Sequence, residues 1–510
     1  MPVQSIVALR DVSFKFDISA DPLFSGLSVS FPGGFSGIVG ANGVGKSTLL
    51  QLIAGIVQPE DGVVQAEGKV IYCDQRTDDP PDELSSFLQD TDGEAYALRG
   101  RLLIDDDFLE RWPSLSHGER KRTQIAVALW QRPDVLAIDE PTNHIDGAAR
   151  QLLMDNLQRY QGVGLIVSHD RDLLDRLCQH CLWLEPPDST LYKGGYSQAR
   201  EQRQLDRETA INARDQAKRE RNRLNKEMIR RRDKADRADS RKSKRHIAPK
   251  DHAAKGKIDL AIYSGKDGQA GRLRRQIAGR LAIADVELEA QRVGKEYAAD
   301  LWLPGSRAPT STLLFVEAGA IPLGHDDAEL NFPALHLQRE DRVAITGNNG
   351  AGKSTLVDYL LSRLAIPRER LIVIPQELGD AASRQLIKQV KRLPAEKLGH
   401  VMTVVSRLGS RPNRLLESER LSPGELRKLM LALGVARSPY LIVMDEPTNH
   451  LDLPSIEALE RALQGCPCGL LLVSHDQAFL DKVANRHWRV VRGEEGSVVN
   501  TDECSLSNRV

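Results

Sequence analysis

The stretch Gly40-Ala-Asn-Gly-Val-Gly-Lys46-Ser47-Thr48 decides the fold, because it recurs 307 residues later as Gly347-Asn-Asn-Gly-Ala-Gly-Lys353-Ser354-Thr355. Each copy follows a short apolar run, at Ser36 to Val39 and at Val343 to Thr346, and opens a helical pattern. A Gly-x-x-x-x-Gly-Lys-Ser sequence between a strand and a helix is the context of a phosphate-binding loop. The chain therefore carries two candidate phosphate loops, each in an α/β domain.

Three further pairs of motifs recur at an offset of 306 residues. They are Leu115-Ser-His-Gly-Glu119 with Leu421-Ser-Pro-Gly-Glu425, Asp139-Glu-Pro-Thr-Asn-His-Ile-Asp146 with Asp445-Glu-Pro-Thr-Asn-His-Leu-Asp452, and Ser168-His169-Asp170 with Ser474-His475-Asp476. An offset constant to one residue indicates an internal duplication rather than chance matches. We expect two α/β domains, at residues 1–197 and 304–500, followed by a disordered polar tail at 501–510.

The phosphate loops predict nucleotide binding. Their glycines allow backbone N–H groups to close around β- and γ-phosphates, the lysine supplies a point charge, and the serine hydroxyl is a ligand for Mg²⁺. A glycine turn at a helix start is the alternative, and the context and the repeat argue against it. The expected contacts are Gly40, Asn42, Gly43, Gly45, Lys46, Ser47 and Thr48, and Gly347, Asn349, Gly350, Gly352, Lys353, Ser354 and Thr355.

Acidic pairs follow two predicted buried parallel strands, at Val135 to Ile138 and at Leu441 to Met444. Asp139 and Asp445 suit Mg²⁺ bound through water, whereas Glu140 and Glu446 are placed to orient or deprotonate an attacking water. His169 and His475 each end a further strand. A lone histidine there is usually structural, but matched positions in two phosphate-loop domains favour a contact with the γ-phosphate.

The segment between the repeats, residues 198–303, is predicted to be a basic helical hairpin. Arg200 to Arg280 holds 26 Lys and Arg against 12 Asp and Glu, a net of +14 in a chain whose total is −1. Neither Gly nor Pro occurs from Tyr196 to Ala248, and a second stripe of apolar residues runs from Leu273 to Leu288. A break with the tip at 249–271 separates the two. The thin stripe of the first helix is Ala210, Ala213, Ala217, Leu224, Met228, Ala235 and Ala238.

This charge density is typical of contact with a nucleic-acid backbone. Tyr263 is the only aromatic residue between Ser197 and Glu296, which favours gripping folded RNA by its phosphates over stacking on single-stranded bases. A solvated helical spacer is the alternative, because charge runs often are no more than that.

The remaining composition predicts a cytoplasmic protein without membrane contact. The apolar runs, such as Tyr440 to Met444, are far shorter than the roughly 18 residues of a membrane span. The start of the chain has neither a secretory signal nor a myristoylation pattern. Six cysteines are sparse for 510 residues, and Cys178 and Cys181 lack a second pair at zinc spacing, so ordinary thiols are favoured over a metal site.

The phosphate loop, the Leu-Ser-x-Gly-Glu signature, the Asp-Glu pair and the histidine together resemble the ATP-binding cassette superfamily over about 400 residues. Two cassettes on one chain, a charged helical linker and Asp-Glu-Pro-Thr-Asn-His twice resemble its ABC-F branch. That resemblance implies an Mg²⁺-dependent ATP hydrolase that associates with the ribosome, where residues 200–280 would contact rRNA and tRNA. It leaves open rescue of stalled ribosomes, sensing of nucleotide levels and displacement of an antibiotic.

The resemblance also implies that the two cassettes of a monomeric chain close head to tail. Gln75 and Gln376 would join the serines and aspartates as Mg²⁺ ligands. One site would combine Lys46, Ser47, Gln75, Asp139, Glu140 and His169 with Ser422 and Gly424 of the facing signature. The other would combine Lys353, Ser354, Gln376, Asp445, Glu446 and His475 with Ser116 and Gly118.

Several positions depart from the family pattern. The glycine usual after the signature serine is His117 in one copy and Pro423 in the other. The aromatic residue expected to stack on adenine aligns with Phe16, but the equivalent position in the second cassette is Leu323, which puts adenine stacking there in doubt. Gln75 to Leu115 is shorter than Gln376 to Leu421, so we expect no extra arm in the first cassette.

The signatures also make physical sense without the family. Ser116 with Glu119 and Ser422 with Glu425 have the spacing of capping boxes, with Pro423 at the first helical position. Two other functions remain as alternatives. A DNA-maintenance ATPase also pairs cassettes around helical hairpins, although it splits the cassette itself. A transporter's energising subunit is weaker, since no segment would span or lie on a bilayer.

Overall fold

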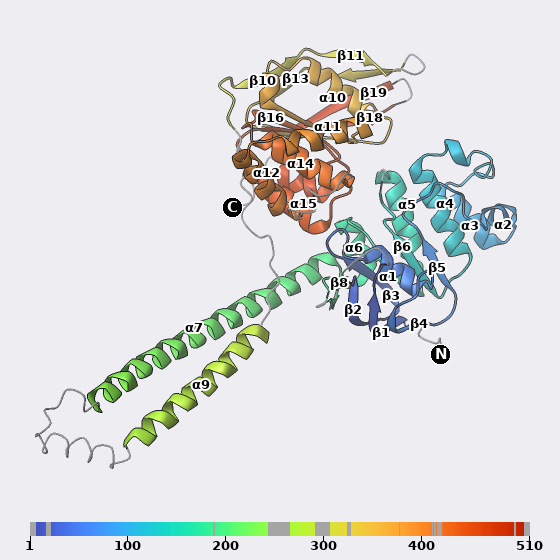
Figure 1. The fold of residues 1–510 in the computed structure, drawn as a ribbon. Coiled ribbons are helices and arrows are strands. Elements are labelled where there is room, and N and C mark those ends of the chain that lie inside the picture. The colour runs from blue at the N-terminus through green and yellow to red at the C-terminus, as the bar shows by residue number, and fades with distance from the viewer. Residues whose placement is uncertain are drawn as a thin grey trace, which may run out of the picture. The chain divides into compact units, whose positions relative to one another are not determined.

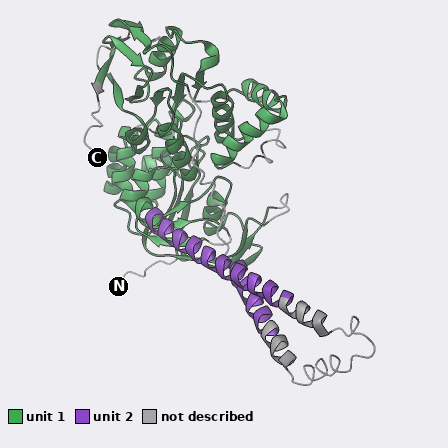
Figure 2. Ribbon diagram, turned by 90° about the vertical axis from the view of Figure 1, so that its left-hand side faces the viewer, with its two compact units in different colours: residues 1–199, 297–510 green, residues 200–296 purple. Residues whose placement is uncertain are grey.

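The structure is a computed structural model of the 510-residue chain. It describes residues 7–16, 22–143, 145, 147–186, 189–242, 266–290, 306–323, 328–376, 378–410, 412, 415, 421–493 and 496–503. The chain divides into two compact units, residues 1–199 with 297–510, and residues 200–296 (Figure 2). The first unit contains two α/β cassettes, which confirms the predicted fold class.

The first cassette is built on a six-stranded sheet (Figure 1). Its order is β5 (Val70–Cys73), β6 (Val135–Asp139), β7 (Val163–Val167), β3 (Gly34–Val39), β8 (Cys178–Trp183) and β9 (Thr190–Lys193). All neighbours are parallel except β8 and β9. Every residue of β6 and β7 is buried, because central parallel strands are covered on both faces and are therefore apolar throughout. The predicted strands of this cassette are confirmed.

Helices and a smaller sheet cover the main sheet of the first cassette. The antiparallel sheet has the order β2 (Phe24–Phe31), β1 (Val7–Phe14) and β4 (Asp61–Ala66). The helices are α1 (Lys46–Ile53), α2 (Leu84–Gln89), α3 (Gly93–Leu102), the 3₁₀ turn η1 (Trp112–Ser114), α4 (His117–Trp130), α5 (Gly147–Leu157) and α6 (Arg171–Leu177).

The second cassette repeats the strand order of the first. In its eight-stranded sheet, β15 (Leu371–Ile374), β16 (Leu441–Asp445), β17 (Gly469–Val473), β14 (Arg342–Gly347), β18 (Arg486–Arg492) and β19 (Gly496–Glu503) follow one another. β12 (Glu329–Phe332) and β11 (Gly319–Pro322) extend the sheet beyond β19, while β10 (Thr312–Val316) pairs with β13 (Leu335–Gln338). The internal duplication that the motifs predict is therefore also present in the order of the strands.

The helices of the second cassette lie between these strands in the chain. They are α10 (Lys353–Ser362), the 3₁₀ turn η3 (Arg368–Arg370), α11 (Asp380–Lys391), α12 (Ala395–Arg407), α14 (Pro423–Val435), α15 (Leu453–Gln464) and α16 (Gln477–Val483). The predicted disordered tail is wrong for its first three residues, because β19 continues to Glu503 and pairs with Arg486 at that point. Residues 504–510 lie outside the described residues.

Two polar contacts join the cassettes at the root of the first long helix. Arg171 on α6 donates to Glu460 on α15 over 2.7 Å, and both side chains are buried. The Tyr196 hydroxyl donates to Glu457 over 2.7 Å. Because a buried charge is stable only when it is paired, the α6–α15 contact fixes which faces of the two cassettes meet.

The second unit is a helical hairpin made of α7 (Tyr196–Lys242) and α9 (Lys266–Ala290), which lie side by side (Figures 1 and 2). Arg221 on α7 donates to Asp285 on α9 over 2.9 Å. Among the side chains of the hairpin that the structure describes, the buried apolar ones are Leu224, Ile277 and Ala284, each at most 5% exposed. At about 1.5 Å per residue, the 47 residues of α7 extend roughly 70 Å.

Within the described residues, one prediction for the hairpin is wrong. The break expected at 249–271 is shorter at its end, because α9 begins at Lys266 and includes Gly268 and Gly271. Residues 243–265, which hold the rest of the predicted tip, lie outside the described residues. No described helix is long and apolar enough to cross a membrane. The domain borders at 197/198 and 303/304 stay predictions.

Candidate nucleotide-binding sites

The strand order brings the separate motifs of each cassette to one edge of its sheet. β7 lies between β6 and β3, so His169 after β7 stands between the Asp139-Glu140 pair and the first phosphate loop. In the second cassette, β17 separates β16 from β14 in the same way and carries His475. Because the carboxyl ends of parallel strands share an edge, residues about 100 apart in the chain converge there.

Both phosphate loops depend on glycine. In the first loop, Gly40, Gly43 and Gly45 have φ angles of 157°, 77° and 106°, and a Cβ on Gly40 would come within 2.5 Å of the Leu184 carbonyl. The second loop repeats these values closely at Gly347, Gly350 and Gly352. Helices α1 and α10 start directly after the loops without a side-chain cap. Their first N–H groups are therefore suited to phosphate oxygens.

The two loop lysines are held differently. Lys46 donates to the carbonyls of Gly40 and Ala41 over 3.0 and 3.2 Å, within its own loop. Lys353 makes the equivalent two bonds over 2.7 and 3.1 Å, and its Nζ also lies 3.2 Å from His475 Nε2. Burial lowers the pKa of Lys46, although the neighbouring Glu140, Asp452 and Asp139 raise it.

Asp139 and Asp445 have the chemistry that a bound cation requires. Burial raises the pKa of Asp139, while the nearby Ser47 hydroxyl lowers it. The Tyr72 hydroxyl lies 3.4 Å from Asp139 Oδ2. Burial also raises the pKa of Asp445. A divalent cation would remove the cost of keeping these carboxylates ionised, so the residues fit Mg²⁺.

The two glutamates are in the same unusual backbone conformation. Glu140 and Glu446 both have a φ of 47°, and their N–H groups donate over 2.8 Å to Val167 and Val473 on the adjacent strand. Side chains other than glycine rarely adopt positive φ, at a cost of about 1–3 kcal/mol that the surrounding structure must offset. The conformation therefore marks both positions as candidate functional residues.

Each glutamate lies next to the histidine of its cassette. His169 Nε2 is 3.0 Å from Glu140 Oε1, and His475 Nε2 is 3.5 Å from Glu446 Oε1. The backbone N–H groups of the two histidines also donate to Oε2 of the same carboxylates, over 3.3 and 3.4 Å. Burial raises the pKa of Glu446 to about 7, against the opposing effect of Lys353. A carboxyl group in this range can exchange protons near neutral pH.

Sequence reasoning missed two buried cations, Lys121 and Arg427. Lys121 donates from its Nζ to the carbonyls of Asp74 and Asp139, over 2.5 and 3.0 Å. Arg427 donates to the carbonyl of Glu446 over 2.6 Å and also to that of Gln376. Each cation therefore links two segments of its cassette, the one that holds the predicted glutamine ligand and the one that holds the acidic pair. Their matched place, two residues after the signature glutamate, was the signal that could have revealed them.

Both signature motifs are capping boxes. Ser116 Oγ accepts from the Glu119 N–H over 3.3 Å while the Glu119 carboxylate accepts from the Ser116 N–H over 2.7 Å, and Ser422 with Glu425 repeats the arrangement. Pro423 stands at the first position of α14. The local predictions for α4 and α14 are thus confirmed, and both serines are exposed at a helix N-terminus.

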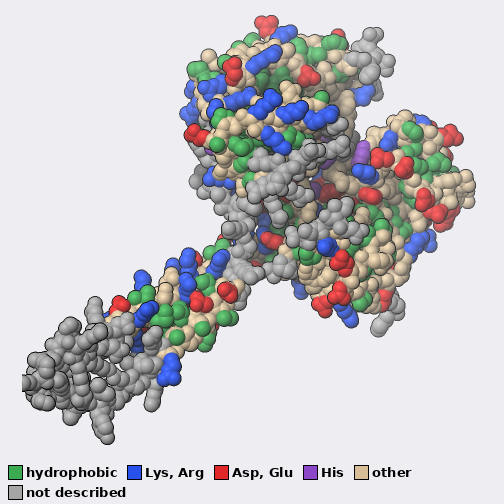
Figure 3. Space-filling model, viewed as in Figure 1, with side chains coloured by type: hydrophobic (Ala, Val, Ile, Leu, Met, Phe, Trp, Pro, Cys, Tyr) green, Lys and Arg blue, Asp and Glu red, His purple; other side chains and the backbone are tan. Residues whose placement is uncertain are grey.

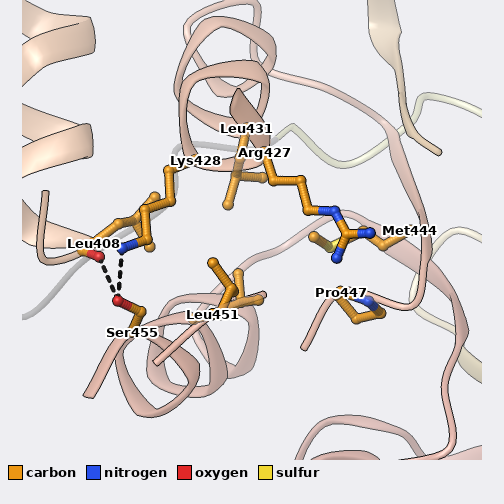
Figure 4. Close-up of a pocket in the computed structure, with 9 residues that line it drawn as sticks. Leu408, Arg427, Lys428, Leu431, Met444, Pro447, Leu451 and Ser455 are labelled. Atoms are coloured by element: carbon orange, nitrogen blue, oxygen red, sulfur yellow. Dashed lines mark hydrogen bonds between the residues drawn. The ribbon is translucent and has the colours of Figure 1, made fainter. Parts of the chain in front are cut away.

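Helix α14 is also tied to the motif that follows β16. Lys428 donates to Ser455 Oγ over 2.7 Å, and this hydroxyl donates to the Leu408 carbonyl over 3.0 Å (Figure 4). A Cβ on Gly424 would meet the His450 carbonyl at 2.5 Å. The signature and the segment around Asp452 therefore form one block.

This block touches the first phosphate loop. The Asn42 N–H donates to Asp452 Oδ2 over 2.7 Å, and the Asn42 side-chain amide donates to the His450 carbonyl over 3.0 Å. The second cassette thus reaches the first loop through Asp452 and His450, whereas the bonds described for Ser422 lie within its own capping box. The pairing of each signature with the opposite loop stays a prediction, as do the roles of the site residues.

The two positions aligned for adenine stacking differ as the sequence indicates. Phe16 is 47% exposed and lies edge to face against Phe14, with ring centroids 5.0 Å apart. Leu323 is half-buried, and its Cδ2 is 2.6 Å from where a Cβ on Gly352 would lie. Gln75 and Gln376 follow β5 and β15, beside the acidic pairs, with exposed side chains.

Comparisons with known proteins support this geometry. A family model described as ABC transporter matches residues 25–143 and 330–449. ATP-binding protein Uup of Caulobacter vibrioides is 30% identical to this chain, with 97% of the chain and 78% of that protein covered. The family model matches twice in this chain, and a relative aligns over almost the whole chain. Together these matches decide the family.

The chain belongs to the ABC-F family.

Other ABC-F relatives align over almost the whole chain. Ribosome protection protein VmlR of Bacillus subtilis is 28% identical, with 95% of this chain and 86% of that protein covered. Tylosin resistance ATP-binding protein TlrC of Streptomyces fradiae is also 28% identical, with 96% and 98% covered. Among solved structures, the complex of the archaeal ribosomal stalk protein aP1 and the recycling factor aABCE1 matches with a TM-score of 0.61 at 18% identity, covering 96% of this chain and 89% of that one. This last likeness concerns the fold alone.

Proposed function

We propose that this ABC-F protein is an ATP hydrolase with one nucleotide site in each cassette. Glu140 and Glu446 orient or deprotonate the water that attacks the γ-phosphate, and His169 and His475 contact that phosphate. Support comes from the buried glutamate beside a histidine at the strand edge next to each phosphate loop. Lys46 and Lys353 neutralise phosphate charge from the loops.

Ser47, Asp139 and Gln75 would hold Mg²⁺ in the first site, and Ser354, Asp445 and Gln376 in the second, where the cation neutralises charge on the β- and γ-phosphates. The exposed glutamine side chains suit this role only if they turn inward when nucleotide binds. Lys121 and Arg427 would hold each glutamine segment at a fixed position relative to its acidic pair, because each cation donates hydrogen bonds to both segments.

ATP binding would hold the cassettes head to tail, with Ser422 and Gly424 completing the first site and Ser116 and Gly118 the second. The contact of Asn42 with Asp452 and His450 supports this orientation. A phosphate at the loop would also be drawn to the N-terminus of the facing signature helix. Hydrolysis removes the γ-phosphate between the two surfaces, so it would release the closed state and act as a timer.

The partner that we propose is the ribosome, acting in the cytoplasm, with α7 and α9 contacting rRNA and tRNA to modulate translation. The described part of the hairpin is basic, since residues 200–242 hold 16 Lys and Arg against nine Asp and Glu. The family relation adds support, because one relative bears the name ribosome protection protein. The observation that carries the proposal is this basic hairpin on a chain with two complete sets of nucleotide-site residues.

The test is co-sedimentation of the purified Glu140→Gln, Glu446→Gln protein with ribosomes. We expect the protein in the ribosomal pellet when ATP is present, because binding without hydrolysis traps the closed state. The Lys46→Ala, Lys353→Ala protein is the control and should stay in the supernatant. Absence of the Gln variant from the pellet at saturating ATP would refute the ribosome as partner. Preference for duplex DNA over rRNA at matched salt would instead favour a DNA-maintenance ATPase.

A further inference from the structure

Helix α11 of the second cassette presents a row of cations to solvent. Arg384, Lys388 and Lys391 follow the spacing of one helix face, and Arg392 caps the C-terminus. All four side chains are exposed. The opposite face is apolar, since Ile387 and Val390 are buried. The burial of that face fixes the helix orientation, so the cations cannot turn inward.

The fold does not require this charge. Between the glutamine segment and the signature, residues 378–421 of the second cassette hold nine Lys and Arg and four Asp and Glu. The corresponding residues 77–115 of the first cassette hold three and eleven. Both regions lie in the chain between the strand that precedes the glutamine and the signature helix of their cassette, β5 and α4 in the first and β15 and α14 in the second. One cassette forms this region with a net charge of −8 and the other with +5. The fold of the region therefore does not explain its positive charge in the second cassette.

Described acidic groups do not neutralise the C-terminal part of the row, from Lys388 to Arg392. Among the described residues, no ion pair involves Lys388, Lys391 or Arg392. Figure 3 shows Lys and Arg side chains gathered on the second cassette, around the position that α11 occupies in the same view of Figure 1. Neighbouring cations repel one another, so a bound anionic partner would lower the electrostatic free energy of this surface.

We propose that the exposed face of α11 is a second RNA-binding surface, which contacts the phosphate backbone independently of the hairpin. Arg384 to Lys391 spans about 10 Å at 1.5 Å per residue, comparable to about three phosphates of one strand at 3.4 Å each. Residues 378–410 contain no Phe, Tyr or Trp on which a base could stack. The surface therefore suits backbone contact without sequence readout. This inference rests on the proposed function for its choice of RNA as the anion.

The experiment measures binding of the full chain to a fluorescently labelled RNA duplex of 20 base pairs, by anisotropy, between 50 and 200 mM KCl. The test variant carries Arg384→Gln, Lys388→Gln and Lys391→Gln. The matched control removes three exposed cations of other elements, with Arg10→Gln on β1, Lys193→Gln on β9 and Arg489→Gln on β18. Both lose the same net charge. Unchanged circular dichroism and ATP binding show that each is folded.

We expect the α11 variant to bind the duplex at least about tenfold more weakly at 100 mM KCl. Its slope of log affinity against log salt should be shallower by on the order of 2 to 3, because each phosphate contact contributes about 0.9 on duplex DNA. The control should change little in either quantity. Equal loss in the two variants would overturn the proposal, since net charge alone would then explain it.

A hairpin variant, Arg214→Gln, Lys218→Gln and Arg219→Gln, separates this inference from the proposed function. If that variant loses RNA binding and the α11 variant keeps it, the α11 proposal fails while the hairpin proposal stands. If only the α11 variant loses RNA binding, the hairpin proposal fails while the α11 proposal stands. An α11 variant that binds RNA normally but no longer sediments with ribosomes would assign the surface to an acidic protein and would also overturn the RNA proposal.

Discussion

The two cassettes share strand order, loop glycines and capping boxes, yet they surround their functional groups differently. Lys46 bonds within its own loop, and the neighbouring residue Asn42 is held by Asp452 of the other cassette. Lys353 makes the equivalent loop bonds but also lies against His475, which contacts Asn349 over 3.1 Å. One set of motifs therefore lies in two different electrostatic settings. It follows that the sites need not turn over equally.

The largest expected effect concerns the pair of glutamates. Glu140→Gln with Glu446→Gln should lower steady-state ATP turnover by about 10² to 10⁴, the usual contribution of general base catalysis. Each single variant then reports the rate of the cassette left intact, so the two rates measure the difference between the sites directly. A double variant with the native rate would show that neither glutamate acts on the water.

The pH dependence of the second site is the next effect. In the Glu140→Gln protein, turnover should rise about tenfold from pH 6 to pH 8, because a base with a pKa of about 7 is mostly protonated at the lower value. The sign follows from burial, which favours the neutral carboxyl and removes the base as pH falls through 7.

The Glu446→Gln protein, measured over the same range, gives the profile of the first site for comparison. A flat profile for the second site, at constant nucleotide affinity, would contradict the assignment of Glu446 as base. It would leave the magnesium and phosphate roles of the neighbouring residues untouched.

The smallest expected effect concerns adenine. Phe16→Ala should weaken ATP binding at the first site by about fivefold or more, since stacking on a base contributes about 1–3 kcal/mol. Leu323→Ala should change binding at the second site much less, because no ring is lost. Titration with a fluorescent ATP analogue in the Lys353→Ala and Lys46→Ala backgrounds isolates the two sites. Equal losses at both would mean that Phe16 does not stack on the base.

Motifs whose partners are close in the chain could be predicted well. The Ser116–Glu119 and Ser422–Glu425 capping boxes follow from a spacing of three residues, and the strands Val135–Asp139 and Leu441–Asp445 follow from continuous apolar runs. The start of α9 was placed too late, because glycine lowers helix stability without forbidding a helix, and Gly268 and Gly271 are helical in a packed hairpin.

Buried cations were harder to foresee. Lys121 stands among charged residues in a sequence that reads as an exposed helix face, and its carbonyl partners are 47 and 18 residues away. The row on α11 was similarly absent from the sequence-based interpretation, because its charges are fewer than those of the hairpin. Its exposure becomes evident only once Ile387 and Val390 are seen to be buried on the other face.

The sequence by itself determined the duplication, the fold class and the family resemblance, and it supplied the candidate residues of each nucleotide site, since these depend on residue type and spacing. The tertiary structure alone decided the approach of Asp452 to Asn42, across 410 positions, and the raised pKa of Glu446. The physical reason is that desolvation and long-range hydrogen bonds depend on which surfaces pack together. The local sequence supplies the ionisable side chains, and tertiary packing determines their pKa values and their hydrogen-bond partners.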